Sequence, residues 1–146
     1  MGGDDMRALR ARREALVLEH VAAENDKDVE RVMRTFARPC YDLAVAGGGL
    51  VEGDAAVRDL QARNWAAFSG VRYEPVRLHH ADQAVVLEYR VRGRHEGNYL
   101  GVPPTGALID VPAIAVFEFE GADLVCERPY VNQAMLLAQM KQGDPS

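Results

Sequence analysis

His95 is the titratable side chain that the sequence places most clearly on the inner face of a strand. From residue 85 to 91 every second residue is apolar, which is the pattern of a strand with one buried face. His95 is in phase with Tyr89 and Val91, so its ring is expected to point into the interior beside them. Imidazole titrates near neutral pH and suits acid/base chemistry. The alternative is a structural histidine that closes the strand by bonding to a backbone carbonyl.

His20 is the second histidine with two possible roles. It lies on the apolar stripe of a predicted helix, one turn before Glu24. In the functional interpretation it is a base or an orienting group that the helix contributes to a pocket. In the structural interpretation it is a core histidine with a local hydrogen-bond partner. Two aromatic side chains, Trp65 on a later helix and Tyr89 on the strand of His95, are expected to contact a ligand in the same pocket.

Composition excludes several classes of partner. The chain has 146 residues, 48% apolar residues and a net charge of −5, with no basic cluster interleaved with aromatics. These properties predict one soluble domain that does not bind nucleic acid. No apolar run reaches the ~20 residues that a membrane span needs, and the acidic N-terminus lacks a signal-peptide pattern, so a cytoplasmic protein is expected. No local run of His, Cys, Asp or Glu has metal-site spacing, so no metal is expected. No cofactor is expected either, because a pocket of this kind would itself supply the acid, the base and the oxyanion donors.

The elements that must position these side chains follow from periodicity. Helical spacing of apolar residues predicts helices, and alternation between turn residues predicts strands. The predicted helices are 7–25, 28–37, 55–68 and 133–139. The predicted strands are 41–45, 50–51, 71–80, 83–95, 107–119 and 123–131. Short reversals at 81–82 and 121–122 favour antiparallel neighbours. Helices followed by a meander of strands indicate an α+β fold.

A motif in the second half of the chain resembles a known family. The residues that carry the resemblance are Arg92, Gly93, His95, Gly97, Leu100, Gly101, Pro103, Pro104, Thr105 and Gly106, followed by Glu127, Tyr130, Asn132, Gln133, Leu136, Leu137 and Gln139. This pattern is similar to that of the SnoaL-like polyketide cyclases, within the nuclear transport factor 2-like, or cone-fold, superfamily. The similarity covers roughly residues 14–140.

The resemblance implies a specific architecture. The expected fold is a cone-shaped α+β barrel, in which three N-terminal helices pack on a strongly curved, mainly antiparallel sheet and leave a cavity. Residues 1–146 would form this single domain, with frayed ends at about 1–6 and 141–146. The outer face of the sheet is expected to pair with a second copy, because residues 114–119 are apolar on both faces.

The last predicted strand departs from the family pattern. In the family this region resembles H-W-D-Y-W-D-Q and supplies an aspartate as acid/base in an intramolecular aldol reaction. Here Pro129 and Asn132 stand where the family has aspartates, and neither side chain accepts a proton from carbon. The expected base is therefore His95, with Glu127 or His20 as the next candidates. Asn132 and Tyr130 are expected to donate hydrogen bonds to a developing enolate oxygen.

The resemblance implies that the protein acts on a small molecule. It does not by itself define the reaction, because members of one superfamily catalyse different reactions. The resemblance favours a cofactor-independent cyclase or isomerase that acts on a small apolar, polyketide-like carbonyl compound by proton transfer. Two alternatives stay open. One is a non-catalytic binding protein with the same pocket, and the other is a hydratase or an enzyme similar to epoxide hydrolases.

Overall fold

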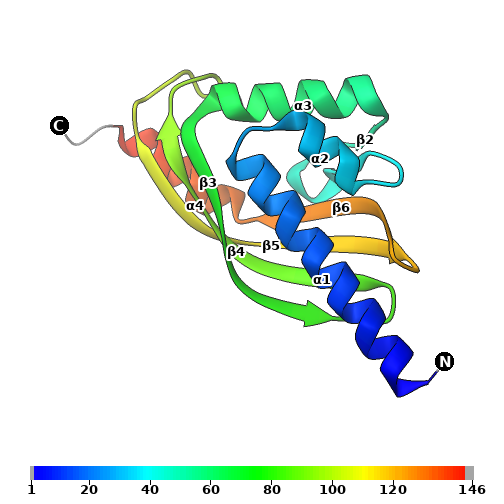
Figure 1. Cartoon of the computed structure of the whole chain (residues 1–146). Helices are drawn as coiled ribbons and strands as arrows, with labels where there is room; N and C mark the ends of the chain where they lie inside the picture. Colours follow the sequence, from blue (N-terminus) through cyan, green and yellow to red (C-terminus); the bar gives the residue numbers. More distant parts are fainter. Residues whose placement is uncertain (1, 144–146) are drawn as a thin grey trace.

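The computed structural model describes residues 2–143, and Figure 1 shows the arrangement of its elements. The helices are α1 (Gly3–Asn25), α2 (Val29–Thr35), the 3-10 helix η1 (Ala44–Ala46), α3 (Asp54–Ala67) and α4 (Gln133–Gln142). The strands are β1 (Cys40–Asp42), β2 (Leu50–Glu52), β3 (Phe68–His80), β4 (Ala84–His95), β5 (Leu108–Glu120) and β6 (Asp123–Val131). The predicted α+β class is confirmed, with helices packed on one side of a single curved sheet.

The six strands form one mixed sheet in the order β2-β1-β6-β5-β4-β3. The long strands β3 to β6 are antiparallel neighbours, and β1 runs parallel to β6. Figure 1 shows α1, α2 and α3 on one side of this curved sheet. The alternation predicted for the strands is strongest in β5, where Ile109, Val111, Ala113, Ala115, Phe117 and Phe119 are all buried. Their side chains form the floor of the core.

The prediction of a barrel is wrong, because the sheet does not close. Its two edges are β2 and β3, and each of them has only one strand neighbour. β2, at one of these edges, is only three residues long. Helix α3 contacts both edge strands and so bridges the opening between them. A helix therefore completes the wall that a further strand pairing would have formed.

Local signals explain where the helices begin and which faces they bury. Asp28 caps α2, because its carboxylate accepts a hydrogen bond from the backbone N–H of Arg31 at 3.2 Å. In α1, Val17, His20, Val21 and Glu24 are all buried, and these positions share one face at helical spacing. This face places an imidazole and a carboxylate against the sheet.

Several boundaries differ from the sequence prediction. For example, β3 begins at Phe68 rather than at residue 71, and α4 extends to Gln142 rather than to residue 139. Helix α1 begins at Gly3, so residues 3–6, which were expected to fray, belong to a helix. The strand predicted over 41–45 is confined to Cys40–Asp42, because Ala44–Ala46 form a 3-10 turn. Met1 and residues 144–146 lie outside the described part of the chain, so the expectation for these ends is not tested.

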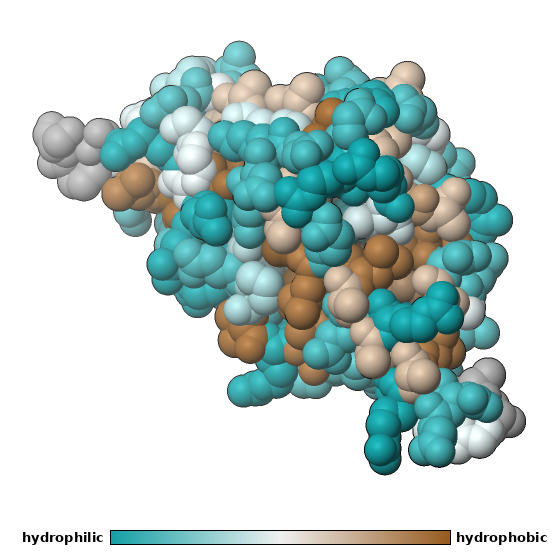
Figure 2. Space-filling view, in the orientation of Figure 1, coloured by the Kyte–Doolittle hydropathy of each residue, from teal (hydrophilic) through white to brown (hydrophobic). Residues whose placement is uncertain are grey.

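Helix α4 is anchored to the sheet by one side chain. Gln139 accepts a hydrogen bond from the backbone N–H of Asp110 at 2.7 Å and donates one to its carbonyl at 3.0 Å. This pair of bonds holds the C-terminal helix across β5. Among the described helices none has the length and apolarity of a membrane span. The face of the molecule in Figure 2 is largely hydrophilic, with apolar residues gathered near its middle.

Candidate functional site

A cavity of about 540 Å³ lies between the sheet and the helices. Its wall is largely apolar and aromatic, with Tyr73, Tyr89 and Phe117 contributed by three different strands. The exposed lining residues include Arg63 of α3 and Asn98 and Leu100 of the loop after β4, so these elements form the rim. A cavity of this size with a mainly apolar wall suits a small organic molecule.

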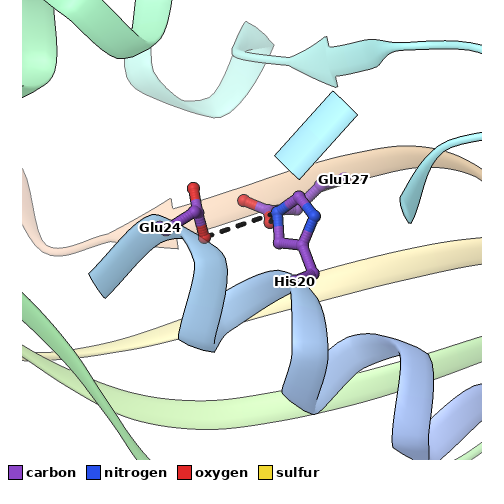
Figure 3. A group of neighbouring side chains, drawn as sticks. All are labelled: His20, Glu24 and Glu127. Carbon is purple, nitrogen blue, oxygen red and sulfur yellow. Dashed lines mark ion pairs between the residues drawn. The ribbon is translucent and has the colours of Figure 1, made fainter. Parts of the chain in front are cut away.

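Three buried polar side chains line this apolar cavity. They are Glu24 of α1, Tyr41 of β1 and Glu127 of β6, which are 7%, 3% and 6% exposed. His20 lies one helical turn before Glu24, is completely buried and does not line the cavity. Figure 3 shows that His20, Glu24 and Glu127 point toward one another from α1 and β6. We call these three residues together with Tyr41 the polar cluster.

The orientation of His20 is determined by its contacts on both sides of the ring. Its Nδ1 lies 2.8 Å from the hydroxyl of Thr35. That hydroxyl donates to the backbone carbonyl of Val32 at 2.6 Å, so it accepts from Nδ1–H. Nε2 therefore faces the carboxylates, 3.0 Å from Glu127 Oε1 and 3.4 Å from Glu24 Oε1. The ring presents Nε2 to both acids at once.

Tyr41 and Gln61 complete the hydrogen bonding around Glu24. The Tyr41 hydroxyl lies 3.1 Å from His20 Nε2 and donates to Glu24 Oε2 at 3.3 Å. The Gln61 amide, on α3, donates to the Tyr41 hydroxyl at 2.7 Å and to Glu24 Oε2 at 3.2 Å. These bonds hold the tyrosine hydroxyl at the cavity wall as a positioned donor.

Burial and mutual charge perturb the ionisable groups of the cluster. Burial raises the pKa of Glu127, the charge of Glu24 raises it further, and His20 lowers it, with a net rise to about 7. Burial lowers the pKa of His20, but Glu24 and Glu127 outweigh that effect and raise it to about 10. Burial, reinforced by the charge of Glu24, raises the pKa of Tyr41 well above its ordinary value. Tyr41 is thus a neutral donor beside a charged His20.

This arrangement can accept and donate protons inside an apolar environment. Glu127 offers a carboxylate to a bound molecule, and Tyr41 offers a hydroxyl. The ring of His20 is held edge-on by Phe36 and Phe117, with centroid distances of 5.2 and 5.4 Å. Because His20 is enclosed in this way, its direct influence is on the two carboxylates rather than on a ligand.

The structure brings three of the sequence-predicted site residues to this region. Tyr89 and Glu127 line the cavity, and His20 lies behind it in contact with Glu127. The Thr35 contact also supports part of the structural interpretation of His20, because the histidine has a local hydrogen-bond partner.

Two other candidates are buried beside the cavity without lining it. His95 is completely buried, and its Nδ1 lies 3.0 Å from the Thr105 hydroxyl. Its ring packs against Phe68 at a centroid distance of 5.6 Å, and Phe68, not His95, lines the cavity. Trp65 is half-buried, packs against a group of buried residues that includes Val71 and Leu136, and does not line the cavity. His95 is buried, as its phase along the strand predicted, but the neighbouring Phe68 lines the cavity and His95 does not.

Tyr130 and Asn132 are not brought to the cavity. Tyr130 projects from the outer face of β6, is 40% exposed and accepts a hydrogen bond from Arg128 at 3.1 Å. Asn132 is exposed and caps α4, because its side-chain oxygen accepts from the backbone N–H of Met135 at 3.0 Å. Tyr130 and Asn132 point away from the cavity because side chains alternate along a strand, and Glu127, Pro129 and Val131 take the inward positions.

The capping contact of Asn132 makes a direct prediction about stability. Asn132→Ala removes an N-cap and is expected to lower the free energy of unfolding by about 1 kcal/mol, whereas Asn132→Asp keeps an equivalent cap and changes it little. Urea denaturation of the three proteins measures the difference. Equal stability of Asn132→Ala and the unchanged protein would contradict the capping role.

Glu24, Tyr41, Gln61 and Thr35 were not among the residues predicted for the site. The spacing of His20 and Glu24 was a usable signal, because residues four apart share a helix face. Tyr41 and Gln61 carry no such signal, since they come from a three-residue strand and a different helix. Only the folded chain brings them to Glu24.

Comparison with known proteins agrees with this architecture. The model of the SnoaL-like polyketide cyclase family matches residues 14–140. No curated protein of similar sequence was found. A candidate polyketide cyclase from Xanthomonas campestris is 22% identical, with a TM-score of 0.81 over 90% of this chain and 98% of that one.

Two further solved structures have the same fold. AclR from Streptomyces galilaeus, a candidate hydroxylase, is 24% identical with a TM-score of 0.74 over 93% of this chain and 84% of that one. A protein with a ketosteroid isomerase-like fold from Catenulispora acidiphila is 19% identical with a TM-score of 0.73, over 86% and 92% of the two chains. At these identities the likeness concerns the fold. Because the family model spans most of the sequence, the chain belongs to the SnoaL-like polyketide cyclase family.

Proposed function

We propose that this protein is an enzyme that transfers a proton at the carbon next to the carbonyl group of a small, largely apolar compound. The observation that carries the proposal is the position of Glu127, a buried carboxylate in the wall of a mainly apolar cavity. A carboxylate within reach of a C–H bond in such a site acts as a general base.

The other groups of the polar cluster suit the same reaction. When a proton leaves the α-carbon, negative charge develops on the carbonyl oxygen. The Tyr41 hydroxyl lines the cavity and is held by Gln61. Its single proton, which is donated to Glu24 in this structure, would turn to that oxygen when a carbonyl compound is bound. Such donors stabilise the transition state more than the ground state. His20 provides a counter-charge behind the carboxylates.

Membership of the family supports a cyclisation or an isomerisation as the form of the reaction. Both reactions proceed through an enolate of the substrate. The aromatic wall of the cavity suits a substrate or product that contains a ring. Tyr73, Tyr89 and Phe117 provide flat apolar surfaces for such a ligand. The proposed substrate class is therefore a polyketide-like carbonyl compound.

Deuterium exchange tests this proposal without knowledge of the natural substrate. The purified protein is incubated in D₂O with enolisable cyclic ketones, and loss of the α-proton signal is followed by NMR. Faster exchange than in buffer, inhibited by an apolar competitor, is the expected result. Binding of the ketones without faster exchange would favour a binding protein instead. A product that has gained water would favour the hydratase alternative.

We also propose that two copies associate through the outer face of the sheet. Ile114 of β5 is 40% exposed and lies directly opposite Tyr130 of β6, which is equally exposed. Burial of this apolar pair gives a reason for a self-complementary contact.

Sedimentation velocity is expected to show a species of twice the 16.1 kDa chain mass. Ile114→Asp is expected to shift it toward the monomer. A monomer alone at micromolar concentration of the unchanged protein would refute the association.

A further inference from the structure

The imidazole of His20 and the carboxylates of Glu24 and Glu127 converge on one point in the polar cluster. One ligand atom from each of His20, Glu24 and Glu127 lies within 4.8 Å of the others, and all three residues are buried. They come from α1 and β6, which are far apart in the sequence. This convergence explains why no local run of residues indicated a metal site.

The distances match those between neighbouring ligands of one ion. Bonds from zinc to nitrogen or oxygen are ~2.0–2.2 Å long, so two ligand atoms at adjacent positions are separated by roughly 3–3.4 Å. His20 Nε2 lies 3.0 Å from Glu127 Oε1 and 3.4 Å from Glu24 Oε1. Both separations correspond to adjacent positions around a single cation.

One of these atoms, Oε1 of Glu127, is close to His20 but accepts no hydrogen bond of good geometry from any residue of the described range. This oxygen is buried, and the residue as a whole is 6% exposed. A buried carboxylate oxygen without a hydrogen bond is costly, and a cation between it and Nε2 would remove that cost.

His20 is oriented in the way that metal-binding histidines usually are. A ligating histidine donates its second ring N–H to a neighbouring acceptor, which fixes the tautomer and the ring orientation. Here Nδ1–H donates to Thr35, and Nε2 is left to face the carboxylates. The two aromatic rings that hold His20 edge-on fix its position further.

The charges also balance. Metal binding displaces the proton from Nε2 of His20. The two carboxylates and the neutral imidazole then carry two negative charges, and a divalent ion neutralises them in a site without bulk water. Glu24 and Glu127 line the cavity, so further coordination positions would be open toward a bound molecule.

We infer that His20, Glu24 and Glu127 bind one divalent first-row transition-metal ion at the wall of the cavity. Imidazole favours such ions over magnesium and calcium, and carboxylates accept them as well. Coordination through Oε1 of Glu127 leaves the second oxygen of that carboxylate for a bound molecule. The inference goes beyond the proposed reaction and stands without it.

Titration with metal alone tests the inference. The full chain is dialysed against a chelator and then titrated with Co²⁺, followed by calorimetry and visible absorption, with Zn²⁺ as competitor. One Co²⁺ per chain, displaced by Zn²⁺ and bound more tightly than Mg²⁺, is the expected result. No uptake, or equal affinity for Mg²⁺, would overturn the inference.

Variants locate the site. Glu127→Gln and His20→Gln are expected to weaken Co²⁺ binding by more than the ~10–100-fold that loss of an outer-shell partner causes, and Thr35→Val is expected to weaken it within that range. His79→Gln is the matched control, because His79 pairs with Glu88 at 2.6 Å on the exposed surface.

Circular dichroism identifies the variants that fold. Unchanged Co²⁺ affinity in folded Glu127→Gln and Thr35→Val, or a loss of binding in His79→Gln, would overturn the assignment. Because no organic compound is present, a negative result leaves the deuterium-exchange test of the proposed function unaffected.

Discussion

Replacing Glu127 by glutamine is expected to slow α-proton exchange by about 10²–10⁴-fold, the usual contribution of a general base. The amide has nearly the same shape as the carboxylate but does not accept a proton from carbon. Ketone binding should change far less than turnover, because the remainder of the wall is apolar and unaltered. NMR exchange rates and ligand titrations on the same preparation separate the two effects.

Glu118→Gln provides the matched control for this experiment. Glu118 is an acid on the neighbouring strand that faces outward and pairs with Arg128 at 2.7 Å. Glu118 does not line the cavity, so the Glu118→Gln protein should catalyse α-proton exchange at the rate of the unchanged protein. A wild-type rate in Glu127→Gln would show that the base is another group. A loss in Glu118→Gln as well would point to a general effect on the fold.

Truncation of Phe117 is expected to have the largest effect on stability. Its side chain is 1% exposed, belongs to the hydrophobic core between the helices and the sheet, and contacts the ring of His20 at a centroid distance of 5.4 Å. Phe117→Ala removes an aromatic ring from the core and is expected to cost about 3–5 kcal/mol. Urea denaturation followed by circular dichroism gives the difference in the free energy of unfolding.

Val76→Ala tests whether such a loss is specific to the core. Val76 lies on the edge strand β3 and is 61% exposed, so its truncation should change the free energy of unfolding by no more than about 0.5 kcal/mol. A loss below 1 kcal/mol for Phe117→Ala would mean that the ring is not packed as described.

Local patterns in the sequence were sufficient for the elements and the class of the fold. Alternation indicated the inward phase of Tyr89 and His95 because a strand has a period of two. Helical spacing placed His20 and Glu24 on one buried face of α1. The family motif added the cone-like arrangement. Closure of the sheet was predicted wrongly, since no local pattern reveals that α3 bridges two edge strands.

The site depended on contacts between segments that are distant in the sequence. Alternation along β4 predicted that His95 points inward, but only the packing shows that its neighbour Phe68 lines the cavity and that His95 does not. The motif drew attention to Asn132, whose side chain caps α4. The sequence by itself determined which faces are buried, because burial follows from periodicity within one element. The tertiary structure decided that Glu24, Tyr41 and Glu127 share one wall, because that depends on how α1, β1 and β6 pack together.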